Sequence, residues 1–137
     1  MENKSNIRYR FYQKPPDYVK RYFPILFKSW NIECEKDEFC WLMLDGKTPI
    51  ACVYGKIEET SVDEKGSLRT ILSIGKFEVR KTYRRIGYGR IFFNWIVEKY
   101  MAKSVGLYFL DDDALKFWHK MGLKRQRGTD YLVKKYE

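Results

Sequence analysis

The stretch that decides the fold runs from residue 71 to residue 100, and its centre reads Phe77-Glu78-Val79-Arg80-Lys81-Thr82-Tyr83-Arg84-Arg85-Ile86-Gly87-Tyr88-Gly89-Arg90. The β-branched and apolar residues up to Val79 predict a strand, and the apolar residues after Arg90 recur at helical spacing. Each glycine near a helix start costs up to roughly 1 kcal/mol relative to alanine. Two of them, one residue apart, indicate that a ligand approaches the backbone closely.

The start of this helix is a candidate anion site. The first amides of a helix have no partner inside it, and the helix dipole makes that end partly positive. Five cations lie around it, with Glu78 as the one acid between Phe77 and Arg90: Arg80, Lys81, Arg84, Arg85 and Arg90. A polyphosphate is the natural ligand. The glycine spacing alone leaves a solvated basic turn as the alternative.

Two signatures in this chain resemble those of a known family. The spacing lacks the Gly-Lys-Ser/Thr of a P-loop and the third glycine of a dinucleotide fingerprint. Arg84-x-x-Gly87-x-Gly89 instead resembles the acetyl-coenzyme A signature of the GNAT superfamily of N-acyltransferases. Further on, Ala114-x-x-Phe117-Trp118-x-Lys120-x-Gly122-Leu123 is similar to the second signature of that family, Ala-x-x-Phe-Tyr-x-Lys-x-Gly-Phe.

The rest of the chain predicts the order of elements. Apolar or aromatic residues alternate with cationic ones over 7–12, which predicts a strand. Apolar residues over 18–30 recur at helical spacing after a possible cap at Asp17. Because Pro24 interrupts them, they predict a kinked helix or two short ones. Strands are predicted over 39–44 and 50–57 with an Asp45-Gly46 turn, and a polar connection over 58–69. The strands at 71–79 and 105–110, joined by one helix, are predicted to be parallel. A helix over 114–121 follows, capped by Asp111–Asp113 and ended by Gly122, and then short strands over 123–126 and 131–135.

This order resembles the GNAT fold over nearly the whole chain. The predicted fold class is α/β (α+β), with a mixed, mostly antiparallel sheet of about seven strands and three to four helices, in a single domain over 1–137. The formal charge of +9 implies an anionic partner. Cys34, Cys40 and Cys52 are expected to be reduced, and no metal site is expected. Neither a membrane span nor a signal peptide is evident, so we expect a cytoplasmic protein.

The resemblance implies that acetyl-CoA lies where the parallel strands separate. The backbone of Phe77 and Val79 would pair with the pantetheine arm, and an amide near Val79 would polarise the thioester carbonyl. Asp111, Ala114 and Phe117 would line the other wall. The backbone amides from Arg84 to Arg90 would hold the diphosphate, and the side chains of Arg84 and Arg85 would add positive charge. The cofactor-binding residues implied in this loop are Arg84, Arg85, Ile86, Gly87, Tyr88, Gly89 and Arg90.

The implied reaction is direct attack of an amine on the acetyl thioester. At pH 7, deprotonating a lysine costs roughly 4.6 kcal/mol and an α-amine roughly 1.4 kcal/mol, so a base matters more for lysine. The positions where the family often carries a carboxylate hold Ser73 and Gly106, and its usual tyrosine acid aligns with Trp118. The candidates left are Glu78 as base, with Tyr108 or Tyr131 as acid. Glu78 as an exposed strand residue and Tyr108 as a core residue are the alternatives.

Three functions are consistent with these observations. The first is an acetyl-CoA-dependent N-acetyltransferase acting on a primary amine. The second is a GNAT-like domain that binds the cofactor with weak or no turnover and serves as a sensor or interaction module. The third and weakest is nucleic-acid binding through the positive charge and the tyrosines. The amine acceptor is not readable from the sequence, and the chain would be a monomer or a homodimer.

Overall fold

The computed structural model describes residues 6–28 and 32–136. Its contacts divide the chain into two compact units, one within Met1–Gly55 and Lys76–Phe93, the other within Lys56–Gly75 and Asn94–Glu137. The predicted single domain over 1–137 stays a prediction, and each unit is described by itself.

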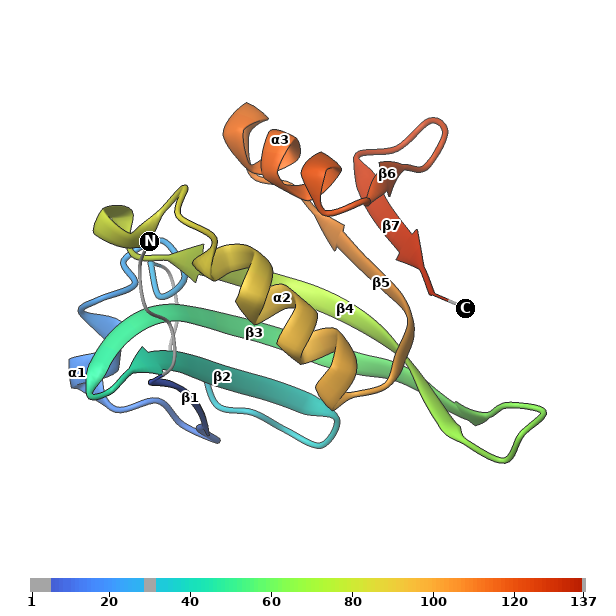
Figure 1. Cartoon of the computed structure of the whole chain (residues 1–137), viewed down its shortest axis with the longest axis horizontal. Coiled ribbons are helices and arrows are strands. Elements are labelled where there is room, and N and C mark those ends of the chain that lie inside the picture. The colour runs from blue at the N-terminus through green and yellow to red at the C-terminus, as the bar shows by residue number, and fades with distance from the viewer. Residues whose placement is uncertain (1–5, 29–31, 137) are drawn as a thin grey trace. The chain divides into compact units, whose positions relative to one another are not determined.

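The fold class is confirmed: the strands form one mixed seven-stranded sheet in the order β1-β2-β3-β4-β5-β7-β6 (Figure 1). The strands are β1 Ile7–Phe11, β2 Glu38–Asp45, β3 Thr48–Val62, β4 Leu68–Val79, β5 Ala102–Tyr108, β6 Lys124–Arg125 and β7 Tyr131–Lys135. Within the described residues the helices are α1 Asp17–Lys20, α2 Tyr88–Lys99 and α3 Asp112–Lys120, with a short 3-10 helix, η1, at Lys81–Tyr83. None of these helices has the length and apolar character needed to cross a membrane.

In the first unit, β1 and β2 pair as antiparallel strands, with a register that runs from Ile7↔Asp45 to Phe11↔Trp41. The predicted Asp45-Gly46 turn is confirmed, because β2 ends at Asp45 and β3 starts at Thr48. Gly46 has a φ of 60°, in the left-handed region that favours glycine.

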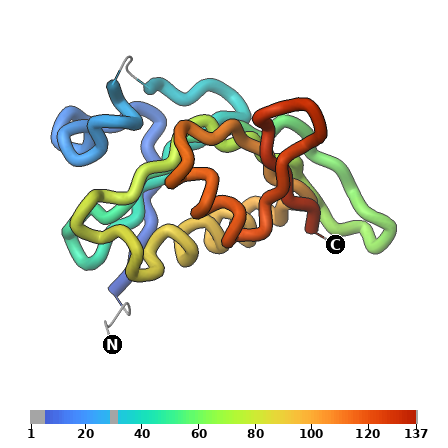
Figure 2. Tube along the Cα trace, turned by 90° about the horizontal axis from the view of Figure 1, so that it is seen from above, coloured from blue at the N-terminus to red at the C-terminus, as the bar shows by residue number. Residues whose placement is uncertain are grey.

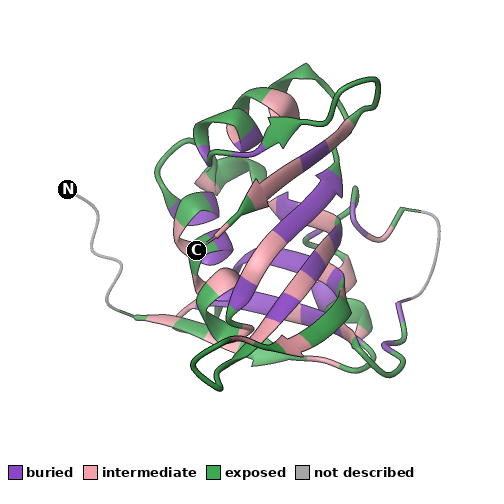
Figure 3. Cartoon of the chain, turned by 90° about the vertical axis from the view of Figure 1, so that its right-hand side faces the viewer, coloured by how far each residue is buried: buried purple, intermediate pink, exposed green. Residues whose placement is uncertain are grey.

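Apolar side chains cover both faces of the strands in the first unit. On one face, residues of the segment after β1 form a core with β2 and β3: Val19, Phe23, Leu26, Ile32, Cys34, Cys40, Leu42, Leu44 and Cys52. On the other, the ring of Phe92 in α2 stacks on that of Tyr9 with centroids 5.7 Å apart and contacts the ring of Phe77 in a tilted arrangement at 5.6 Å. The three cysteine thiols are free and buried. Figure 3 shows buried residues concentrated in the strands.

The predicted helical segment over 18–30 is mostly wrong. Up to residue 28, where the description of this segment stops, the structure has only the four-residue α1 followed by turns; Trp30 lies outside the described residues. Pro24 lacks an N–H and its ring clashes with the preceding turn, so the helical pattern cannot pass through it. Asp17 is not the cap either: Pro16 holds that position, and Asp17 pairs with Lys20 at 3.5 Å. Figure 2 shows this segment coiled on itself in blue.

The predicted polar connection over 58–69 is also wrong, because most of it is strand in the second unit. β3 continues to Val62 and β4 begins at Leu68. The turn is held by Asp63, whose carboxylate accepts the amides of Lys65 and Ser67, both at 2.9 Å. Hydrogen bonds between β3 and β4 keep this segment in strand conformation, although its polar composition is typical of a loop.

The rest of the second unit follows the prediction closely. β4 and β5 are parallel, from Thr70↔Ala102 to Ile74↔Leu107, as expected for strands joined by one crossover helix. β5 spans Ala102–Tyr108, so it starts and ends before the predicted 105–110. Asp111 caps α3 by accepting the amide of Ala114 at 2.8 Å, and Gly122 follows the helix with a φ of 93°.

Candidate functional site

The loop between β4 and α2 turns sharply at two residues. Arg85 and Gly87 have φ values of 68° and 98°, both in the left-handed region. The Gly87 carbonyl accepts the amide of Ile91 at 3.1 Å, which opens the first turn of α2. The amides of Tyr88, Gly89 and Arg90 lie before Ile91 in this first turn, where backbone N–H groups have no acceptor within the helix and favour an anion.

The side chains of this loop divide into exposed and inward groups. Arg84, Arg85, Ile86, Gly87 and Arg90 are exposed. Tyr88, by contrast, is only 1% exposed, and its hydroxyl lies 3.5 Å from the Asp45 carboxylate. The side chain of Tyr88 therefore belongs to the core, and only its backbone is available to a ligand.

Arg80 anchors the loop to the sheet. Its amide donates to the Ile50 carbonyl at 2.9 Å and its guanidinium to the Pro49 carbonyl at 2.9 Å. The same guanidinium lies 4.4 Å above the ring of Tyr22 and 5.4 Å from that of Tyr83. Arg80 thus connects β3, the loop and the segment after α1.

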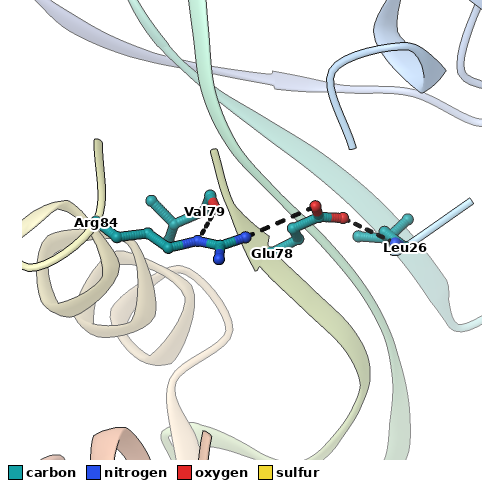
Figure 4. A network of polar contacts seen from close by, with 4 residues as sticks. All are labelled: Leu26, Glu78, Val79 and Arg84. Carbon is teal, nitrogen blue, oxygen red and sulfur yellow. Dashed lines mark hydrogen bonds and ion pairs between the residues drawn. The ribbon is translucent and has the colours of Figure 1, made fainter. Parts of the chain in front are cut away.

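Glu78 is a buried carboxylate, with its side chain 5% exposed. The alternative that it is an exposed strand residue is therefore wrong. Its Oε1 accepts the backbone N–H of Leu26 at 2.8 Å, and Oε2 lies 3.9 Å from the Arg84 guanidinium (Figure 4). Burial raises the pKa of Glu78, while the amides of Leu26 and Ile25 and the charge of Arg84 act in the opposite direction.

Arg84, the first residue of the signature, points back at the strand. Its Nε donates to the Val79 carbonyl at 2.7 Å, and its terminal nitrogen faces Glu78 (Figure 4). The side chain is 43% exposed, so it remains partly in contact with solvent. The contact with Val79 closes the loop onto the end of β4.

A cavity of about 450 Å³ in the first unit joins these groups. Tyr22, Pro24 and Ile25 form an apolar wall, and Glu78, Arg80 and Arg84 supply the charged groups. The sequence patterns did not place the segment after α1 in this site. Pro24 is the residue that could have indicated this. A proline disrupts the hydrogen bonds of a regular helix, so the amides that follow it can bind Glu78 instead.

The second unit resolves the position of Tyr131, which pairs with Tyr108 across β5 and β7. A Cβ placed on Gly106 would lie only 2.0 Å from the Tyr131 hydroxyl, so the phenol occupies the space that any side chain at 106 would need. Burial raises the pKa of Tyr131, and the nearby hydroxyl of Ser73, which lies opposite Gly106 on β4, acts in the opposite direction. Ser73 and Gly106, the positions where the family often carries a carboxylate, thus lie near the hydroxyl of Tyr131.

Tyr108 itself is 70% exposed, so the alternative that it is a core residue is wrong. Its ring contacts that of Tyr131 at 4.8 Å between centroids. Of the residues assigned to the second wall, Asp111 is exposed, and Ala114 and Phe117 are half-buried. Phe117 packs edge-on against Trp118 at 4.7 Å.

The structure therefore groups the predicted residues in two sets. The first unit holds Phe77, Glu78 and Val79 on β4 together with the loop from Arg84 to Arg90. The second holds Tyr108, Asp111, Ala114 and Phe117. Among the described residues, no group of three or more His, Cys, Asp or Glu is placed to hold a metal ion.

Comparisons with known proteins agree with this architecture. No curated protein matches the chain. Arabidopsis thaliana NAA60 in complex with acetyl-CoA has a TM-score of 0.64 at 18% identity, over 94% of this chain and 98% of that one. Arabidopsis thaliana Naa50 with the bisubstrate analogue CoA-Ac-MVNAL has a TM-score of 0.59 at 17% identity, over 96% and 99%.

A third similar structure is the AtaT Y144F mutant toxin bound to the C-terminus of the antitoxin AtaR and acetyl-CoA, with a TM-score of 0.61 at 7% identity, over 96% of this chain and 94% of that one. At such identities these structures support the fold alone. The family model of the acetyltransferase (GNAT) family, however, matches residues 5–123, most of the chain. The chain therefore belongs to the GNAT acetyltransferase family.

Proposed function

We propose that this chain is an N-acetyltransferase that moves an acetyl group from acetyl-CoA to a primary amine by direct attack on the thioester. The observation that carries the proposal is the buried Glu78 carboxylate in the wall of a cavity, next to the exposed loop that opens α2. Burying a carboxylate costs folding free energy unless the group is paired, so buried carboxylates in cavities are candidates for functional groups.

The loop fits the diphosphate of acetyl-CoA. Arg85 and Gly87 have left-handed conformations and are exposed, whereas Tyr88 and Gly89 are buried. The dipole of the twelve-residue α2 favours an anion at its first amides. The proposed ligands are the backbone from Arg84 to Arg90, with Phe77 and Val79 for the pantetheine arm. Asp111, Ala114 and Phe117 are proposed as further cofactor-binding residues. Bound acetyl-CoA supplies the activated acyl group.

Glu78 would act as the base for the acceptor amine. Because burial raises its pKa, the carboxylate is a stronger proton acceptor than an exposed glutamate. In the proposed step the amine nitrogen forms a bond to the thioester carbon and the carbon–sulfur bond breaks. The ammonium proton goes to Glu78, directly or through water, and the thiolate takes a proton from an acid.

Two tyrosines are proposed as that acid. Tyr108 is exposed and accessible, and Tyr131 is more enclosed, with its hydroxyl against Gly106 and near Ser73. The variants Tyr108→Phe and Tyr131→Phe each remove only a hydroxyl. The one that supplies the proton should lower kcat by roughly 100-fold, and the other should leave kcat nearly unchanged.

The acceptor is proposed to be a free amine of a peptide or small molecule. Naa50 was solved with a bisubstrate analogue that includes MVNAL, which makes a peptide a natural first probe. Residence in the cytoplasm and a monomeric or homodimeric state remain predictions.

The decisive experiment measures free thiol released from acetyl-CoA with three amines: a peptide with a free N-terminus and no lysine, an N-blocked peptide with one lysine, and spermidine. We expect turnover above hydrolysis with at least one of them. Binding of acetyl-CoA without amine-dependent thiol release would instead support the sensor module. Binding of nucleic acid with steep salt dependence and no effect of acetyl-CoA would contradict the proposal.

A further inference from the structure

Arg84 was expected to contact the diphosphate, yet in the structure its guanidinium is turned toward β4. Nε donates to the Val79 carbonyl at 2.7 Å, and the terminal nitrogen lies 3.9 Å from Glu78 Oε2 (Figure 4). The first contact is short and charge-assisted, so it holds the planar guanidinium in one orientation. In that orientation the terminal nitrogen Nη2 faces the buried acid.

Arg84 is the cation that stabilises the buried charge of Glu78. Its side chain is 5% exposed, and the one ion pair recorded for it among residues 6–28 and 32–136 is with Arg84. The Leu26 amide satisfies Oε1, which leaves Oε2 facing the guanidinium. A buried carboxylate without a nearby cation would take up a proton rather than remain charged.

We propose that Arg84 is a positioning residue that acts through Glu78: it holds the carboxylate at the cavity wall and leaves the diphosphate to the loop amides and the neighbouring cations. This inference rests on the proposed function, because it concerns the base of the same reaction. It assigns to a signature residue a task different from the one that the signature implies.

Other groups also face Glu78 and set the background for the test. Arg80 and Lys81 line the same cavity, and the amides of Ile25 and Leu26 approach from the segment after α1. The Cys52 thiol on β3 is close enough for the charge of Glu78 to contribute to raising its pKa. Arg80 is held by Pro49 and Ile50, so removing Arg84 leaves this background in place.

The test compares Arg84→Gln with Arg85→Gln, neighbouring exposed arginines of the same loop, and with Arg127→Gln in the exposed turn between β6 and β7 as a neutral control. Three quantities are measured: the Kd for acetyl-CoA by calorimetry, the pH profile of kcat/KM for the acceptor, and the titration of the Glu78 carboxyl by carbon-13 NMR. The NMR titration requires no turnover.

For Arg84→Gln we expect a Kd within about twofold of the wild type, a Glu78 titration midpoint at higher pH, and an acidic limb of kcat/KM displaced in the same direction. For Arg85→Gln we expect a weaker Kd by about threefold to tenfold and an unchanged Glu78 midpoint. Arg84→Lys keeps the charge without the planar fork, so its Glu78 midpoint should lie between those of the wild type and Arg84→Gln.

The proposal is overturned if Arg84→Gln weakens acetyl-CoA by tenfold or more while the Glu78 midpoint stays in place, because Arg84 is then a diphosphate ligand. If Arg84→Gln does not fold, Arg84→Lys decides by the same two measurements. A wild-type protein that releases no thiol refutes the proposed function alone, since the Glu78 titration still shows whether Arg84 controls the carboxyl.

Discussion

The carboxylate of Glu78 accepts the backbone N–H of Leu26 at 2.8 Å, although 52 residues separate them in the chain. The bond exists because Pro24 interrupts the helical pattern after α1 and because β4 carries Glu78 toward the same cavity. An acid that would be unremarkable on an exposed strand thereby becomes buried, directional and chemically useful.

Replacing Glu78 with glutamine tests its role as base. Glutamine keeps the shape and can still accept the Leu26 amide, but it cannot take a proton from the amine. We expect kcat to fall by roughly 100-fold or more, the typical contribution of a positioned base. The Kd for acetyl-CoA should change little, because Glu78 is not among the proposed cofactor ligands. Equal kcat values for variant and wild type with a lysine acceptor would exclude Glu78 as the base.

The same variant predicts a change in how stability depends on pH. The pKa of Glu78 is raised in the folded state, so just above the usual range of a glutamate the folded protein binds more protons than the unfolded chain. Stability contributed by this group is therefore present at low pH and is lost as pH rises through the folded-state pKa.

Urea unfolding of both proteins between pH 4 and pH 7 measures this effect. The free energy of unfolding of Glu78→Gln minus that of the wild type should increase as pH rises through that window, because only the wild type loses the contribution of Glu78. A difference that stays constant with pH would show that burial does not govern the titration of Glu78.

Gly87→Glu tests the anion site at the start of α2. The new side chain adds bulk and negative charge beside the first helical amides, so acetyl-CoA should no longer stabilise the protein. In the wild type, free acetyl-CoA at about one hundred times its Kd should add roughly 2.7 kcal/mol to the free energy of unfolding. Thermal denaturation with and without acetyl-CoA measures both.

Gly87 has a φ of 98°, so a substitution there also carries backbone strain of about 1–3 kcal/mol. Gly66→Glu in the turn between β3 and β4 is the matched control, because Gly66 has a φ of 81° and open space around it. Both variants should lose stability, but only Gly66→Glu should keep the response to acetyl-CoA. A retained response in Gly87→Glu would argue against the diphosphate site.

Gly106→Ala tests the packing of Tyr131 in the second unit. The added Cβ would lie 2.0 Å from the phenol oxygen, so the ring must move. We expect a loss of about 1–3 kcal/mol in the free energy of unfolding, as for other overpacked sites. In a Tyr131→Ala background the same substitution should cost clearly less, because the clashing group is gone. Additive losses in this double-mutant cycle would contradict the contact.

Much of the fold was determined by the sequence itself. Arg84-x-x-Gly87-x-Gly89 follows a β-branched run and precedes a helical one, and this local pattern predicts the strand, loop and helix that the structure contains. The Asp45-Gly46 turn and the Asp111 cap were predictable for the same reason, since each depends on a few neighbouring residues.

Tertiary structure decided what depends on distant residues. Pairing between β3 and β4 made strand of a polar segment, and Pro24 left only four residues of helix in α1. The burial of Glu78 beside Leu26 and the position of the Tyr131 hydroxyl against Gly106 each join residues far apart in the chain. Arg84 turns toward partners only five and six residues away, but the acid that it faces is buried by that distant segment. Their chemistry depends on desolvation and on partners in space, and neither is encoded in local spacing.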